Sequence, residues 1–263
     1  MNNFWDAATY SQFIDLRTRP AMELLAVLPL TFQPQTIYDL GCGPGNSTIL
    51  LKNRWPNAKI VGLDSSTSML EKARSAYPTI SFIESDISDF FPTEKIDLIF
   101  ANASLQWADN HQELFPRLIN FLNEDGALAI QMPNNFHAPS HQITLNILKE
   151  NSDWEALLKI LCYGKLKQPF YQVPYYYDLL AQSGLYNLQL WETEYFLEMA
   201  DHQAIFHWVE GSALRPILSK MDTEEQARFT QIYIGQLRQE YPLQENRKVL
   251  FPFRRMFMVG FKL

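Results

Sequence analysis

The chain has 263 residues, of which 47% are hydrophobic and 14% aromatic, enough apolar material for a sizeable core. This composition excludes disorder for most of the chain. No apolar run approaches the roughly 20 residues that cross a bilayer, and the first six residues, MNNFWD, lack the basic and apolar segments of a secretory signal. We therefore expect a cytoplasmic protein without a membrane partner.

The 22 lysines and arginines are outnumbered by 29 aspartates and glutamates, which gives a net charge of -7. Such a chain has no general attraction for phosphate backbones, so nucleic acid is not an expected partner. An anionic substrate would need a local basic pocket to overcome the mean field of the protein. Cys42 and Cys162 are far apart and outside any metal-binding spacing, so neither a metal site nor a disulfide is predicted.

The first half of the chain alternates short apolar runs with amphipathic stretches. The apolar runs predict strands at residues 36–40, 59–64, 80–84, 96–102 and 127–132, and helical periodicity predicts helices at 20–27, 47–54, 67–77 and 110–122. Residues Asn123, Asp125 and Gly126 are typical of a turn after the last of these helices. This order predicts an α/β fold: a Rossmann-like, mostly parallel sheet with helices on both faces.

After Met132 helical patterns predominate. Helices are predicted at residues 141–149, 153–161, 178–182, 202–211 and 223–241, a strand at 187–197, and one or two closing strands within 248–263. The aromatic run Tyr175 to Tyr177 is interpreted as a packed helix face. We expect one domain over residues 1–263, with an N-terminal helical lid at 1–30 and a helical cap at 133–175 and 200–245 over the site of the reaction.

The sharpest motif is DLGCGPGNS, from Asp39 to Ser47, where the first predicted strand meets the first predicted helix of the sheet. Alternate glycines let the backbone turn tightly and approach a ligand closely. A dinucleotide fingerprint would have glycine where Asn46 stands, and the acidic Asp39 would repel a pyrophosphate. The loop therefore suits a cofactor that carries a cation, such as S-adenosylmethionine with its sulfonium and α-ammonium.

Polar residues also follow the next three predicted strands. Asp64 stands where a carboxylate accepts hydrogen bonds from ribose hydroxyls. Asp86 could accept the adenine amino group, with Ile87 covering the ring, and Asn102 ends the fourth strand. An alternative for Asp64 and Asp86 is that they cap the following helices. Cys42 is interpreted as a small apolar neighbour, because no histidine base lies in its motif.

With these motifs the sequence resembles the class I S-adenosylmethionine-dependent methyltransferases, and within them the carboxyl methyltransferases that act on trans-aconitate. The resemblance is carried by residues 39–51, 54–75 (RWPNAKIVGLDSSTSMLEKARS), 97–107 (DLIFANASLQW), 112–134, 202–218 and 241–258, the last two including LRP and YPLQEN. Residues 150–172 show no family pattern. The glycine loop identifies only the cofactor, whereas the later segments bear on the acceptor.

The resemblance implies formation of a monomethyl ester on one carboxylate of this small tricarboxylate. Since a carboxylate is ionised near neutral pH, in-line attack on the sulfonium methyl needs no general base and no catalytic side chain beyond positioning. The implied cofactor-binding residues are Tyr10, Asp39, Gly41, Cys42, Gly43, Asn46, Asp64, Ser65, Met69, Asp86, Ile87 and Asn102.

The remaining carboxylates of the acceptor need cationic anchors, for which the planar fork of arginine is suited. Candidates are Arg17, Arg19, Arg215, Arg254 and Arg255. At least two of the five are expected to be solvated surface charges. Arg254 and Arg255 are neighbours on a predicted strand and face opposite sides, so only one can line the pocket.

Three further side chains are candidates for the acceptor site. Trp107 is expected in the wall between cofactor and acceptor, while His202 and His207 could donate hydrogen bonds or simply pack and cap their helix. The expected acceptor set is Arg17, Trp107, His202, Arg215 and Arg255.

Two alternative functions remain open. The first is a carboxyl methyltransferase of the biotin pathway that acts on a malonyl group held by an acyl carrier protein; an acidic carrier would require an exposed basic patch, against which the net charge argues mildly. The second is a non-catalytic sensor or partner subunit that binds the cofactor. We expect a monomer or weak dimer.

Overall fold

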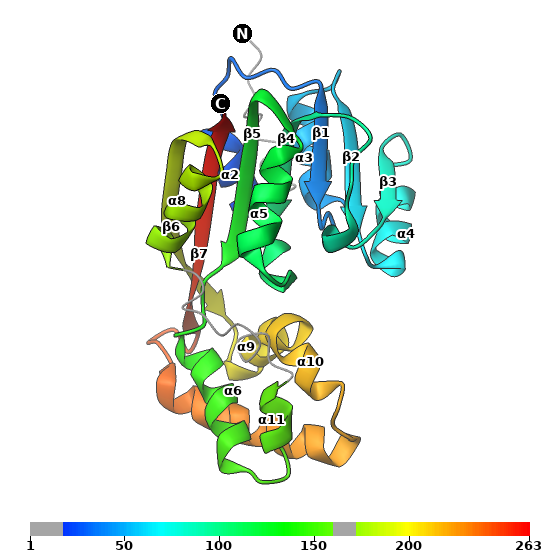
Figure 1. The fold of residues 1–263 in the computed structure, drawn as a ribbon. Coiled ribbons are helices and arrows are strands. Elements are labelled where there is room, and N and C mark those ends of the chain that lie inside the picture. The colour runs from blue at the N-terminus through cyan, green and yellow to red at the C-terminus, as the bar shows by residue number, and fades with distance from the viewer. Residues whose placement is uncertain (1–17, 160–171) are drawn as a thin grey trace. The chain divides into compact units, whose positions relative to one another are not determined.

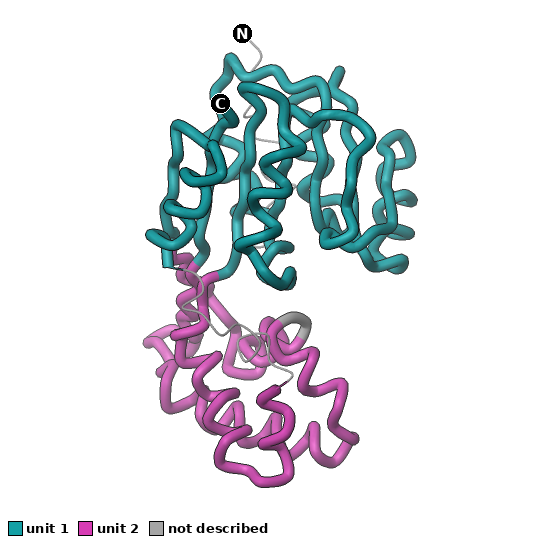
Figure 2. The backbone as a smooth tube through the Cα atoms, in the orientation of Figure 1, with its two compact units in different colours: residues 1–133, 171–193, 255–263 teal, residues 134–170, 194–254 magenta. Residues whose placement is uncertain are grey.

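A computed structural model of the protein describes residues 18–159 and 172–263. The chain divides into two compact units, coloured separately in Figure 2. Unit 1 consists of Met1–Pro133, Tyr171–Thr193 and Arg255–Leu263, and unit 2 of Asn134–Phe170 and Glu194–Arg254. In the described residues, no helix combines the length and apolar character that a bilayer crossing requires.

Unit 1 is built on a seven-stranded sheet with the order β3-β2-β1-β4-β5-β7-β6 (Figure 1). The strands are β1 Thr36–Leu40, β2 Lys59–Asp64, β3 Ser81–Glu84, β4 Ile96–Asn102, β5 Leu122–Pro133, β6 Leu185–Met199 and β7 Val249–Lys262. Strands β1 to β5 pair in parallel, and β7 pairs antiparallel with β5. The predicted mostly parallel α/β fold is therefore confirmed.

The helices of unit 1 are α2 Arg19–Val27, which precedes β1, and α3 Asn46–Arg54, α4 Thr67–Ala76, α5 His111–Asn120 and α8 Val173–Gln182, with the short 3-10 turns η1 Ile87–Asp89 and η2 Leu105–Trp107. The chain runs from β1 outward to β2 and β3, and then returns to the other side of β1 with β4 and β5. Right-handed crossovers therefore place α3 and α4 on one face of the sheet and α5 on the other. The order of the strands reverses between β1 and β4, which is where open α/β sheets bind ligands.

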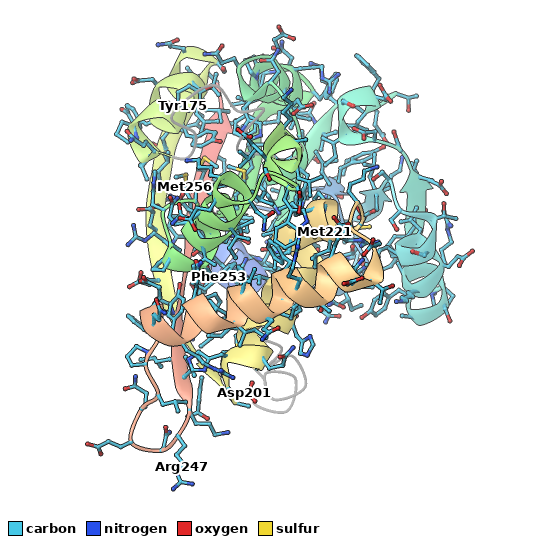
Figure 3. All side chains as sticks on the ribbon, turned by 90° about the horizontal axis from the view of Figure 1, so that it is seen from below. Tyr175, Asp201, Met221, Arg247, Phe253 and Met256 are labelled. Carbon is cyan, nitrogen blue, oxygen red and sulfur yellow. The ribbon has the colours of Figure 1, made fainter. Side chains whose placement is uncertain are left out.

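Unit 2 is mainly helical. Its elements are α6 Pro139–Glu150, η3 Glu155–Lys159, α9 His202–Val209, the π-helical turn η4 Glu210–Leu214, α10 Arg215–Leu218 and α11 Thr223–Glu240, together with the end of β6 and the start of β7. Asp201, labelled in Figure 3, caps α9 by accepting a hydrogen bond from the Ala204 N–H. Phe229 of α11 is fully buried and stacks on Tyr233. That this unit covers the acceptor stays a prediction.

Strands buried on both sides were predicted most accurately. The observed bounds of β1, β2 and β4 equal the predicted ones, because a buried parallel strand is a continuous apolar run between polar residues. The start of β5 was predicted wrongly: it begins at Leu122 and includes the expected turn residues. Asp125 there has a φ of 60°, and the pairing register with β4 shifts between Ile96 and Leu98, so a bulge absorbs the turn residues within the strand.

Three other expectations need correction, whereas the closing segment, one 14-residue strand β7, confirms the expectation of one or two strands there. Within the described part of the predicted helix 153–161, the chain forms the 3-10 turn η3 rather than an α-helix. Helix α8 begins at Val173, not 178, so the aromatic run lies in its first turns, with Tyr176 buried and Tyr177 half exposed. Helix α9 ends at Val209, before the predicted 211, and passes into η4.

Candidate active site

The glycine loop joins β1 to α3 at the point where the strand order reverses. Gly41, Gly43 and Gly45 have φ values of 71°, 54° and 90°, in the left-handed region that favours glycine. A Cβ on Gly41 would lie 2.2 Å from the Cβ of Ser104, whereas a Cβ on Gly43 would meet nothing within 4 Å. Gly41 is thus required by packing, while Gly43 borders open space that a ligand can enter.

Asp39 lies at the carboxyl end of β1 and is fully buried. Its Oδ2 accepts hydrogen bonds from the hydroxyls of Ser47 at 2.7 Å and Thr48 at 2.6 Å. Its Oδ1 is buried without a partner among residues 18–159 and 172–263. Burial raises the pKa of Asp39 from 3.8 to about 6, outweighing the lowering effect of the two hydroxyls. Above pH 6 the carboxylate is therefore a buried anion with one oxygen left for a cation.

Asp64 ends β2 and ties the glycine loop to that strand. Its Oδ2 accepts a hydrogen bond from the Gly43 N–H at 2.9 Å, and its Oδ1 accepts one from the Ser66 N–H at 2.8 Å. Each carboxylate oxygen has a further lone pair for a ligand hydroxyl. The predicted neighbours differ in exposure: Ser65 is exposed, and Met69 in the first turn of α4 is partly buried.

Asp86 follows β3 and begins η1. Its Oδ1 accepts hydrogen bonds from the backbone N–H and the hydroxyl of Ser88, at 2.7 and 2.5 Å, and these bonds lower the pKa of Asp86. The capping role that the sequence left open is therefore realised on one oxygen. The other oxygen accepts no hydrogen bond from a residue that the structure describes, and Ile87 beside it is partly buried.

Asn102 ends β4, beside Gln131 on β5, with which it is paired in register. The Oδ1 of Asn102 is buried and lacks a partner within the described ranges. Like the Oδ1 of Asp39, it lies at the carboxyl edge of the sheet. These two unpartnered acceptors on neighbouring strands suit a ligand group that carries N–H donors, such as an ammonium.

Gln131 is a further residue at this edge of the sheet, and it is not among the residues predicted from the sequence. Its side chain is fully buried, and its Oε1 accepts a hydrogen bond from the Arg255 Nη1 at 3.2 Å. Arg255 is 5% exposed, whereas Arg254 is exposed and pairs with Glu194 at 3.4 Å, as strand alternation leads one to expect. The signal that could have revealed Gln131 is a lone amide in an otherwise apolar strand, ALAIQM.

The other predicted residues of unit 1 have distinct environments. Trp107 in η2 is 49% exposed, and Cys42 is buried against Leu70 and Phe82. Burial raises the pKa of the Cys42 thiol, which keeps it neutral and fits its interpretation as a small apolar neighbour. Asn46 is exposed in the first turn of α3.

Three predicted or considered acceptor residues belong to unit 2. His202 is buried, and its Nε2 donates to the Tyr241 carbonyl at 2.7 Å, which favours the packing interpretation for that nitrogen. Arg215 is exposed at the start of α10, and its side chain makes no hydrogen bond or ion pair with another described residue. His207 is exposed and pairs with Glu210 at 3.1 Å. Convergence of Arg215 and His202 with Arg255 of unit 1 stays a prediction.

Three expectations concern the N-terminal segment. Tyr10 and Arg17 lie outside the described residues. Arg19 pairs with Glu23 at 2.9 Å on the exposed side of α2, so this ion pair is of the surface type that contributes little stability.

Comparison with known proteins agrees with this architecture. A family model described as a methyltransferase domain matches residues 37–126, which span β1 to the start of β5. Among solved structures, the YcgJ protein from Bacillus subtilis matches with a TM-score of 0.61 and 14% identity, covering 93% of this chain and 98% of that one. A putative methyltransferase from Bacillus halodurans matches with a TM-score of 0.58 and 13% identity, covering 93% and 99%. At these identities the likeness concerns the fold.

Sequence relatives are far closer. The trans-aconitate 2-methyltransferase of Escherichia coli O7:K1 is 45% identical over 256 residues, which cover 97% of each chain. The proteins of the same name from Escherichia coli K12 and Shigella flexneri are 44% identical over the same coverage. The similarity thus includes both units rather than the sheet alone, and the chain belongs to the trans-aconitate 2-methyltransferase family.

Proposed function

We propose that this protein transfers a methyl group from S-adenosylmethionine to one carboxylate of trans-aconitate and releases the monomethyl ester. The acceptor rests on one observation, the 45% identity that extends over 97% of the chain. Because fold alone does not determine a substrate, this near-complete coverage, unit 2 included, is what supports trans-aconitate rather than another acid.

The residues at the carboxyl edge of the sheet fit the cofactor. Asp39 and Asn102 each offer a buried acceptor oxygen without a partner among the described residues, matched to the α-ammonium group. Asp64 offers lone pairs to the ribose hydroxyls, and Asp86 offers its second oxygen to the adenine amino group, with Ile87 against the ring. When bound, S-adenosylmethionine supplies an electrophilic methyl group on its sulfonium.

The further cofactor residues that we propose are Tyr10, Gly41, Cys42, Gly43, Asn46, Ser65 and Met69. Among them Gly43 has the clearest structural support, since the space beside its Cα is open. Asp64 holds the Gly43 backbone in place through the 2.9 Å hydrogen bond. The loop is thereby fixed before the cofactor arrives, which limits the entropy lost on binding.

For the chemical step, the protein has to position the acceptor rather than deprotonate it. The attacking carboxylate is already ionised near neutral pH. Holding the reacting atoms in line is worth up to roughly 7 to 11 kcal/mol in well-oriented systems. We propose that Arg17, Arg215 and Arg255 bind the remaining carboxylates. Trp107 would form the wall between cofactor and acceptor, and His202 would be a further hydrogen-bond donor.

The test is methyl transfer from labelled S-adenosylmethionine to trans-aconitate, cis-aconitate, isocitrate, citrate and a malonyl-carrier protein, with the product mass measured. We expect ester formation on trans-aconitate and little on the others. Turnover confined to the malonyl carrier would replace the acceptor while keeping the cofactor. Tight cofactor binding with no turnover on any acceptor would contradict the enzymatic function and favour a sensor.

A further inference from the structure

Gln131 stands out because it is a fully buried amide within an apolar strand, next to a buried arginine. Asn102 is its register partner on β4, and Phe257 its partner on β7. Directly paired residues share a face of the sheet, and so do residues two apart along a strand. Asn102, Gln131 and Arg255 therefore lie on one face of three adjacent strands: Asn102 ends β4, Gln131 lies two residues before the end of β5, and Arg255 lies in the middle of β7. In Figure 3, Met256 marks the neighbouring position on β7.

The orientation of the Gln131 amide follows from chemistry. A guanidinium can only donate hydrogen bonds, so the side of the amide that faces Arg255 must be its oxygen. The hydrogen bond from the Arg255 Nη1 to the Gln131 Oε1, at 3.2 Å, has this sense. The opposite side of the amide is then the Nε2 group, which carries two N–H donors.

These donors are buried and have no acceptor among residues 18–159 and 172–263. A buried N–H group without a partner is unfavourable and uncommon in folded proteins. The neighbouring Asn102 has the opposite deficiency, a buried oxygen without a donor. The two amides are register partners but are not hydrogen-bonded to each other. The Gln131 donors therefore remain available to an acceptor on a ligand, and the Asn102 oxygen to a donor on a ligand.

We propose that Gln131 is a specificity-determining residue for the acceptor: its Nε2 donates to a carboxylate oxygen of the acceptor, while its Oε1 orients the Arg255 guanidinium toward the same group. This inference rests on the proposed function, because it takes a carboxylate acceptor as given. Gln131 and Arg255 together form a pair of donors suited to a planar carboxylate. Asn102, one strand away, keeps its proposed role as an acceptor for the cofactor ammonium.

Two substitutions separate the two roles of the amide. Gln131→Glu keeps an oxygen for Arg255 but replaces the donors with a negative charge. Gln131→Met has a similar length and removes both functions. Met132→Leu is the control, because Met132 is equally buried on the same strand but faces the other side of the sheet.

At pH 8, we expect Gln131→Glu to raise the KM for trans-aconitate by about 10- to 100-fold, and Gln131→Met by about 10-fold, in the range of a lost hydrogen bond to a charged group. Binding of S-adenosylhomocysteine, measured by calorimetry, should change less than about two-fold in both variants, which also shows that they are folded. Met132→Leu should leave both quantities at the wild-type level.

A wild-type KM in Gln131→Glu would overturn the proposal, because a residue that only orients Arg255 tolerates that change. So would a loss of S-adenosylhomocysteine affinity as large as the loss for the acceptor, since the amide would then serve the cofactor carboxylate. Should wild-type protein fail to methylate trans-aconitate, the proposed function falls. The inference is then decided by calorimetry of the same carboxylates with the S-adenosylhomocysteine complex: binding that Gln131→Glu abolishes supports it, and no binding overturns it.

Discussion

Asp39 is a residue at which the stability of the fold and the proposed binding of the cofactor have opposite requirements. Its pKa is about 6 in the folded protein against an ordinary value of 3.8, chiefly because of burial. Between these pH values the folded chain binds more protons than the unfolded chain, so stability falls as the pH rises from about 4 to 6 and stays lower above that. Keeping Asp39 ionised at neutral pH costs about 3 kcal/mol, which a bound cation can offset.

Replacing Asp39 by asparagine should therefore stabilise the ligand-free protein while weakening the cofactor site. We expect Asp39→Asn to raise the free energy of unfolding at pH 7.5 by on the order of 1–3 kcal/mol, and to reduce S-adenosylmethionine affinity by about 10- to 100-fold. Denaturant unfolding and calorimetry measure the two effects.

Asp178→Asn, the same change at an exposed position of α8, is the control and should alter neither quantity. A stability gain of equal size at pH 4 and pH 7.5 would show that titration of Asp39 is not the cause. In the wild-type protein, the affinity for S-adenosylmethionine should rise between pH 5 and pH 7, as Asp39 becomes ionised.

Gly43 allows a second test at the residue scale, because the space beside it is open. We expect Gly43→Ala to cost about 1–2 kcal/mol of stability, owing to its positive φ, and to raise the Kd for S-adenosylmethionine at least about 10-fold, because the methyl group enters the ligand space.

Gly235, inside α11, is the matched glycine: a Cβ there also meets nothing within 4 Å, but its φ is not positive. Gly235→Ala should raise stability by up to about 1 kcal/mol through helix propensity and leave cofactor affinity unchanged. If Gly43→Ala binds the cofactor as tightly as the wild type, the cofactor does not lie against this loop.

At the scale of elements, the glycine loop is held by its neighbours rather than by its own sequence. The N–H groups of Gly41 and Cys42 both donate to the Leu63 carbonyl, at 2.7 and 2.9 Å, and Asp64 accepts from Gly43. The hydroxyl of Ser104 donates to the Leu40 carbonyl at 2.6 Å. The end of β2 and the segment after β4 thus fix the loop, which explains how a turn with three left-handed glycines stays ordered.

Helix α11 offers a test of local stability at its N-terminal cap. Asp222 and Glu225 form a capping box, in which each side chain accepts from the other's backbone N–H. Asp222→Ala should reduce the free energy of unfolding by about 1 kcal/mol without changing KM or kcat. Glu224→Ala, in the same turn but outside the box, should cost no more than about 0.5 kcal/mol. Equal losses in the two variants would contradict a specific role for the cap.

At the scale of the whole molecule, a net charge of -7 opposes the approach of a tricarboxylate. Local arginines must overcome this field, and the proposed anchors are spread along the chain: Arg215 in unit 2 and Arg255 in unit 1. Arg215 is the more informative of the two, since it is exposed and makes no ion pair with another described residue.

We expect Arg215→Ala to raise the KM for trans-aconitate by about 10- to 100-fold and to change cofactor affinity little. Arg238→Ala removes the same charge from an exposed position of α11 in the same unit, so it controls for the change in mean field and should have little effect on KM. Equal loss of acceptor and cofactor binding in calorimetric titrations of Arg215→Ala would remove Arg215 from the acceptor site.

Much of the sheet, and the proposed cofactor residues at its carboxyl edge, could be predicted from the sequence because those features are local. Apolar periodicity determined the bounds of β1, β2 and β4, and the rule that parallel strands end at one edge brought Asp39, Asp64 and Asn102 into one hypothesis. The start of β5 escaped prediction because Asp125 and Gly126 are typical of a turn, and only pairing with β4 makes them part of a bulged strand.

Only the tertiary structure decided what depends on distant contacts. Residues 131 and 255 are separated by 124 positions, and no local pattern indicates that β5 and β7 pair so that a buried glutamine meets a buried arginine. The raised pKa of Asp39 likewise arises from burial by neighbouring elements rather than from its motif. Sequence periodicity thus determined most of the strands and helices, whereas strand register and burial, which depend on long-range packing, decided the ionisation and the hydrogen bonds of the candidate site.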